Sequence, residues 1–108
     1  MTSTSVRELL LQISQWAHSS SGVSRVIIAG SQVSHLDSET PIGNSDVDLV
    51  IYLERDTDKN RVMSELAAIG VSTKVLLHPL LISEEERGMK ESIGEYKLMI
   101  ESGKQVFP

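Results

Sequence analysis

Apolar and polar residues recur along the chain with two different periods, and these periods predict helices and strands. Over residues 5–18 the apolar side chains follow the helical period, and Ser5 and Glu8 have the spacing of a capping box at the helix start. Residues 25–29 and 47–53 are short apolar runs rich in β-branched residues, which is typical of buried strands. We therefore expect a helix followed by two strands in the first half of the chain.

The second half of the chain continues the mixture of helix and strand patterns. Residues 57–69 have a helical period with an acidic first turn, and Gly70 is the expected end of this helix. Residues 71–82 form a third apolar run, in which Pro79 indicates an edge strand or a bulge because proline has no N–H to donate. A final helix is expected over much of residues 91–102.

The order helix, strand, strand, helix, strand, helix predicts an α+β fold, in which helices flank a mixed β-sheet. The 108 residues have the length of one domain, and we expect a single domain over residues 1–108. Ser83 and Glu86 have capping-box spacing, which predicts a helical turn directly after the third strand. Trp16 lies on the apolar stripe of the first helix and is expected in the core.

Composition and charge narrow the classes of function. The chain has no cysteine, which excludes disulfides, zinc–thiolate sites and thiol nucleophiles. No segment approaches the ~20 apolar residues of a membrane span, and we expect a cytoplasmic protein. The formal net charge of −5 is opposite to that of a stand-alone nucleic-acid binder, since Lys and Arg are needed to neutralise phosphates. We expect no direct binding to nucleic acid.

Two carboxylates at the start of the second strand are candidates for a metal site. Between Val26 and Glu54 the chain has no Lys or Arg, although Asp46 and Asp48 lie in this segment. Side chains alternate along a strand, so these two carboxylates point to the same face, roughly 6.6 Å apart along the strand. Such a pair suits Mg²⁺, which takes one or two carboxylates and completes its shell with water and phosphate oxygens. Two solvated acids at a strand start are the alternative.

A Gly-Ser pair directly after the first strand is a candidate for binding phosphate. Gly30 allows the backbone to approach a ligand closely, and the hydroxyl of Ser31 can donate to a phosphate oxygen. An ordinary turn is the alternative. Ser45 precedes the carboxylate pair, so an apolar strand, Gly-Ser, a polar connection, Ser-Asp-x-Asp and a second apolar strand follow one another. This combination predicts a phosphate-binding turn beside a metal-binding pair on neighbouring strands.

These motifs resemble those of a known family. Residues 26–31 (Val-Ile-Ile-Ala-Gly-Ser) and 45–50 (Ser-Asp-Val-Asp-Leu-Val) look like the signature of the minimal nucleotidyltransferases, in the DNA polymerase β superfamily. The resemblance continues through residues 78–86 and 100–104 and spans about residues 25–107. It implies a nucleotidyltransferase fold, with a mixed sheet flanked by helices.

The resemblance also implies a function and a set of site residues. Gly30, Ser31 and Ser45 would bind a nucleoside triphosphate, and Asp46 and Asp48 would bind Mg²⁺. Members of the family transfer a nucleoside monophosphate, commonly AMP from ATP, to a hydroxyl group. Many small prokaryotic members pair with a helical HEPN-domain protein as antitoxin and toxin. The implied partners are therefore a nucleoside triphosphate, ATP first, and a HEPN-domain protein.

Departures from the family pattern keep a second interpretation open. Gln32 stands where an Arg commonly follows the Gly-Ser pair, and the connection to Asp46 is longer than usual. The family also has a third carboxylate on the next strand, and an alignment through Pro79 predicts Lys74 in its place, beside Asp46 and Asp48. A lysine there repels the metal that activates the attacking hydroxyl. The chain is then either a Mg²⁺-dependent nucleotidyltransferase or a catalytically degenerate binding module, for example the antitoxin of a HEPN-domain toxin.

Two histidines near these motifs are not expected to act in chemistry. His35 lies in the polar connection, and we expect it in a solvated loop. His78 precedes Pro79 in an apolar run, and we expect a partly buried structural side chain.

Overall fold

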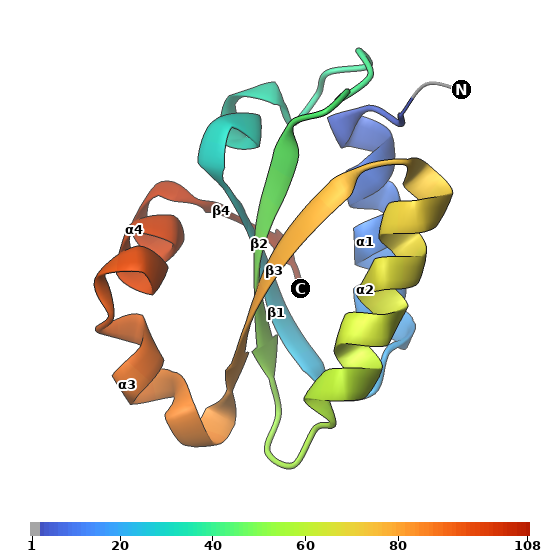
Figure 1. Cartoon of the computed structure of the whole chain (residues 1–108). Coiled ribbons are helices and arrows are strands. Elements are labelled where there is room, and N and C mark those ends of the chain that lie inside the picture. The colour runs from blue at the N-terminus through green and yellow to red at the C-terminus, as the bar shows by residue number, and fades with distance from the viewer. Residues whose placement is uncertain (1–2) are drawn as a thin grey trace.

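A four-stranded mixed sheet with helices on both faces forms the framework of the protein (Figure 1), whose computed structural model describes residues 3–108. The strand order across the sheet is β3 (Leu76–Ser83), β2 (Asp46–Leu53), β1 (Val23–Ala29) and β4 (Lys104–Phe107). β1 runs antiparallel to β2 and β4, whereas β2 and β3 are parallel. The predicted α+β fold with a mixed, helix-flanked sheet is confirmed.

Helices cover both faces of the sheet, as Figure 1 shows. One face is covered by α1 (Val6–Ser19) and α2 (Lys59–Thr73). The other is covered by α3 (Arg87–Glu91) and α4 (Gly94–Ser102). Two short 3₁₀ helices follow strands: η1 (Gly30–His35) comes after β1 and η2 (Glu84–Glu86) comes after β3. No helix within residues 3–108 combines the length and the apolar character needed to cross a membrane.

The face under α1 and α2 holds the larger core. Leu9 and Ile13 of α1 are fully buried there against alternate residues of the central strands. Trp16, also on α1, packs partly buried against this core and donates its indole N–H to Glu65 Oε1 at 2.8 Å, so its predicted place in the core is confirmed. The apolar residues that recur with the helical period in α1 are therefore those that pack against the sheet.

The opposite face has a smaller buried cluster. It comprises Ile27, Val50, Tyr52 and Ile82, against which α4 packs. Because strand side chains alternate, Asp46 and Asp48 share this face with Val50 and Tyr52. The candidate carboxylates therefore lie at the start of β2, on the face with the thinner cover.

Several predicted helix ends and strand positions are confirmed by specific contacts. The backbone N–H of Glu8 donates to Ser5 Oγ at 3.2 Å, as expected at the start of α1. Ser83 and Glu86 form both hydrogen bonds of the capping box before η2. Pro79 lies in β3, which is an edge strand of the sheet as predicted.

The end of α2 differs from the prediction. The helix continues past Gly70 to Thr73 and ends at Lys74, which has a left-handed backbone with φ 58°. Residues 71–73 therefore belong to the helix, and the third strand begins only at Leu76. Gly70 serves a different purpose: a Cβ there would lie 3.1 Å from the carbonyl oxygen of Val75, so the glycine lets the returning chain pass close to the helix.

The last part of the chain agrees with the prediction in one element and differs in another. The helix expected over much of residues 91–102 is confirmed as α4, which begins at Gly94, and the short helix α3 precedes it and ends at Glu91. The strand β4 was not predicted from the sequence. It is only four residues long, and exposed Lys104 and Gln105 hide its apolar character.

Candidate functional site

The pairing of β1 with β2 brings the predicted turn against the predicted carboxylate pair. Ala29 lies opposite Asp48 in the antiparallel register, so Gly30 follows at the same level of the sheet. Gly30 has φ +75°, and a Cβ atom there would lie 2.6 Å from Asp48 Oδ2. The left-handed backbone therefore favours glycine at this position, and a larger residue would also push the Asp48 carboxylate from its present place.

The two carboxylates differ in exposure. Asp46 is exposed as the first residue of β2, whereas the side chain of Asp48 is 31% exposed between its neighbouring strands. The ion pairs formed within residues 3–108 include no contact of Lys or Arg with either side chain. Two carboxylates on one face without a cationic partner repel each other, and a bound cation would relieve that repulsion.

His78 lies beside Asp48, which the sequence did not predict. The parallel register of β2 and β3 places the two residues opposite each other, and His78 Nδ1 is 2.9 Å from Asp48 Oδ1. The imidazole is 53% exposed, so the expectation of a partly buried structural histidine is wrong. Extending the second helix by one turn past Gly70 would have moved the start of the strand and revealed this pairing.

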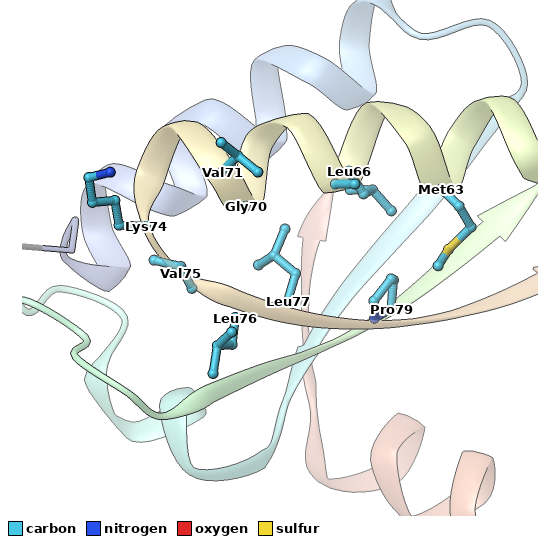
Figure 2. A pocket seen from close by; sticks show the side chains of 10 residues that line it. Met63, Leu66, Gly70, Val71, Lys74, Val75, Leu76, Leu77 and Pro79 are labelled. Atoms are coloured by element: carbon cyan, nitrogen blue, oxygen red, sulfur yellow. The ribbon is translucent and has the colours of Figure 1, made fainter.

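Lys74 does not occupy the predicted place beside the carboxylates. It ends α2 and is not part of β3, whose first residue is paired with Asp46. Lys74 lines a hollow on the α2 side of the sheet (Figure 2), whereas Asp46 and Asp48 face the α4 side. The position predicted for Lys74 is therefore wrong, because the alignment through Pro79 counted the last turn of the helix as strand.

The remaining predicted residues are exposed at this end of the sheet. Ser31 lies in η1 directly after Gly30, and Ser45 directly precedes β2. Neither hydroxyl contacts Asp46 or Asp48 among the hydrogen bonds of the described residues. His35 is exposed at the end of η1, as expected for a solvated position.

The hollow between α2 and β3 is a second candidate site (Figure 2). Its volume is about 610 Å³, and its lining is mostly apolar. On α2, Met63 and Val71 remain solvent-exposed, at 41% and 77%, whereas the side chain of Leu76, 57% exposed, points away from α2 (Figure 2). Sequence analysis did not find this surface, because the residues come from two elements that the prediction had divided at the wrong place.

Polar and charged side chains also surround Tyr52, further along β2 on the α4 face. The hydroxyl of Tyr52 donates to Glu91 Oε2 at 2.7 Å, and the guanidinium groups of Arg25 and Arg87 lie 5.0 and 5.2 Å from the centre of its ring. Burial, followed by the hydrogen bond to Glu91, raises the pKa of Tyr52 to about 12. The hydrogen bond and the two cation–π contacts therefore stabilise the packing around Tyr52, and a smaller hollow lies beside Tyr52 and Arg87.

The donor set at the start of β2 suits a metal shared with a ligand. Within residues 3–108 no three His, Asp or Glu side chains converge closely enough to hold a metal ion by themselves. Mg²⁺, however, binds proteins through one or two carboxylates and takes its other ligands from water and phosphate. Asp46 and Asp48 therefore fit Mg²⁺ carried by a phosphate ligand better than a metal held by protein alone.

Comparison with known proteins gave no matching family model, no matching curated protein and no matching solved structure. The function of this chain is therefore argued from its site.

Proposed function

We propose that the chain binds a nucleoside triphosphate with Mg²⁺ at the start of β2 and transfers the nucleoside monophosphate to a hydroxyl group. The observation that carries the proposal is the contact between Gly30 and Asp48, where a Cβ atom would lie 2.6 Å from the carboxylate oxygen. A turn with a left-handed glycine, directly beside a carboxylate pair on the next strand, is what the sequence resemblance to nucleotidyltransferases implies. ATP is the proposed donor, and the proposed setting is the cytoplasm.

Each residue has a proposed role. Asp46 and Asp48 hold the cation, and bound Mg²⁺ would neutralise charge on the phosphates. Gly30 lets the triphosphate approach the backbone, and Ser31 donates its hydroxyl to a phosphate oxygen. In the reaction, the acceptor hydroxyl gives up its proton to solvent, its oxygen forms a bond to the α-phosphorus, the bond from this phosphorus to the pyrophosphate oxygen breaks, and pyrophosphate leaves. The acceptor is a partner protein or a small molecule.

The test is a calorimetric titration of Mg²⁺ and ATP into the wild type and Asp48→Asn. We expect the variant to bind Mg²⁺–ATP at least tenfold more weakly, because the neutral amide is a poorer ligand for a hard cation. Asp37→Asn is the matched control, since Asp37 is an exposed carboxylate of the same acidic segment that lies outside the site. Transfer is then followed with α-labelled ATP. Equal binding by the wild type and Asp48→Asn would contradict the proposal.

A second candidate function is binding of a partner protein without catalysis. It is favoured by the apolar hollow, beside which Met63 and Val71 are exposed to solvent. Covering a large apolar side chain contributes roughly 1.5–3 kcal/mol, so the two together would contribute to a complex. We propose a HEPN-domain protein as this partner, bound through an apolar helix.

This second function is tested by substitutions at two neighbouring residues of α2, one inside the hollow and one outside it. Met63 lines the hollow, whereas its neighbour Ser64 is exposed on the same helix outside it. Met63→Glu should weaken the complex with a co-expressed HEPN-domain protein at least tenfold, and Ser64→Glu should leave it unchanged. Equal loss in both variants, or in neither, would show that the hollow does not contact this partner.

A further inference from the structure

His78 lies beside Asp48, but the resemblance implies no role for it. Eight consecutive pairs between β2 and β3, from Asp46–Leu76 to Leu53–Ser83, fix the register that places it opposite Asp48. Its Nδ1 is 2.9 Å from Asp48 Oδ1, and its ring is half exposed on the face where the phosphate ligand is proposed to bind. The resemblance implies a third carboxylate on this strand, and His78 is the β3 residue whose side chain contacts Asp48.

We propose that His78 binds the metal ion beside Asp48 and gives the site a preference for Mn²⁺ over Mg²⁺. This inference rests on the proposed function, since it concerns the cation of the same site. Mg²⁺ prefers oxygen ligands throughout, whereas a divalent transition metal accepts an imidazole nitrogen together with carboxylate and phosphate oxygens. Among such ions Mn²⁺ has the coordination preferences nearest to those of Mg²⁺, so it can bind the phosphates in the same way.

The distance between the two side chains matches chelation of one ion. Neighbouring ligands of an octahedral ion with bonds of about 2.1 Å are separated by √2 times that length, or ~3.0 Å. His78 Nδ1 and Asp48 Oδ1 are hydrogen-bonded at 2.9 Å, which is close to this value, so a cation that replaces the shared proton can take both atoms as ligands once the side chains turn toward it. In that state Nδ1 supplies a lone pair and the ring proton is on Nε2.

The two oxygens of Asp48 face different neighbours. Its other oxygen, Oδ2, faces Gly30, where a Cβ would approach it to 2.6 Å. One oxygen of the carboxylate therefore lies toward the proposed phosphate turn, and the other lies toward the imidazole. A cation beside Asp48 thus has the phosphates on one side and a nitrogen ligand on the other.

The experiment measures Mn²⁺ and Mg²⁺ binding in the presence of inorganic tripolyphosphate, which contains no nitrogen. Pulsed electron paramagnetic resonance of bound Mn²⁺ should show coupling to an imidazole nitrogen in the wild type. His78→Gln should lose this coupling, and His18→Gln, which changes an exposed histidine on α1, should retain it. The ratio of Mn²⁺ to Mg²⁺ affinity should fall about tenfold in His78→Asp, because the new set contains oxygen ligands only.

The possible results separate this inference from the proposed function. If Asp48→Asn loses both ions while His78→Gln keeps the wild-type nitrogen coupling and affinity ratio, the metal site stands and the role of His78 is overturned. If the wild type binds neither ion with tripolyphosphate, both proposals fail. Thermal melting of each variant verifies folding, which an exposed side chain on an edge strand is not expected to disturb.

Discussion

The two faces of the sheet differ in how much of β2 their helices cover. Beneath α1 and α2 lies an extended cluster that includes Leu9, Ile13 and Ile51, each fully buried. Beneath α4 the buried cluster contains only Ile27, Val50, Tyr52 and Ile82. Helix lengths explain the difference: α1 and α2 have 14 and 15 residues and are about 21 and 22 Å long, whereas α4 has 9 and is about 13 Å long.

Because of this difference, one part of β2 belongs to the buried core and another part carries the candidate site. The 8 residues of β2 extend about 26 Å, roughly twice the length of α4. From Leu49 to Leu53 the strand is buried on both faces, but its first residues on the α4 face remain accessible. Asp46 is exposed there, and it keeps its hydration without a compensating partner. A thin cover over one end of the sheet is therefore what allows a polar site in so small a protein.

The largest expected loss of stability comes from shortening a side chain in the core beneath α1 and α2. Ile51→Ala removes a fully buried side chain and should lower the free energy of unfolding by roughly 2–5 kcal/mol, through lost burial and the cavity that remains. Ile100→Ala makes the same change on α4, where the side chain is only partly buried, and should cost less than half as much. Urea denaturation of both variants measures the difference. Equal losses would show that the two faces contribute equally to stability.

A second prediction concerns Gly103, the residue at which the chain leaves α4 and packs against the sheet. Gly103 follows the helix, and a Cβ there would lie 2.5 Å from Ile27 Cγ2 and 2.5 Å from the carbonyl oxygen of Met99. Gly103→Ala should therefore destabilise the protein by roughly 1–3 kcal/mol, because backbone and core must both shift. Gly94→Ala is the control: its Cβ meets no atom within 4 Å, so it should be neutral or stabilise by up to about 1 kcal/mol. A destabilised Gly94→Ala, or a neutral Gly103→Ala, would contradict this view of the contact.

The third prediction concerns the pH dependence of stability that Tyr52 gives to the α4 face of the sheet. Burial raises the pKa of Tyr52 from 10.0 in the unfolded chain to about 12, so the folded protein binds the phenol proton more tightly. This contribution is fully present below pH 10 and is lost as the pH rises from 10 to 12, and it amounts to at most about 2–3 kcal/mol. Denaturation between pH 8 and 11.5 should show a falling stability in the wild type. Tyr52→Phe should have a flatter profile. Identical profiles would contradict the view that Tyr52 causes the loss of stability at high pH.

The sequence was most informative where one physical rule acted alone. The apolar stripe of α1, the capping box at Ser83 and the edge position of Pro79 each depend on local geometry, and each was predicted. The same holds for the neighbourhood of Gly30 and Asp48, because a hairpin-like antiparallel pairing follows from two adjacent strands.

Failures occurred where tertiary contacts override local signals. Gly70 has the residue type of a helix end, but the close passage of Val75 explains it, and the helix continues to Thr73. That single error moved the strand boundary, placed Lys74 on the wrong element and hid the contact of His78 with Asp48. The register of parallel strands depends on such boundaries, and a crossover helix of uncertain length leaves them undetermined in the sequence.

The smallest expected change in stability, and the most local one, is at Gly30. Alanine in a left-handed conformation costs roughly 1 kcal/mol, and the added Cβ must displace the carboxylate of Asp48 from its present place 2.6 Å away. Gly30→Ala should therefore melt only slightly below the wild type but bind Mg²⁺–ATP at least tenfold more weakly. Gly43→Ala is the matched control, because Gly43 has φ +74° and nothing within 4 Å of a Cβ, so it carries the backbone cost alone. Equal nucleotide affinity in the two variants would show that the approach of Gly30 to Asp48 has no part in binding.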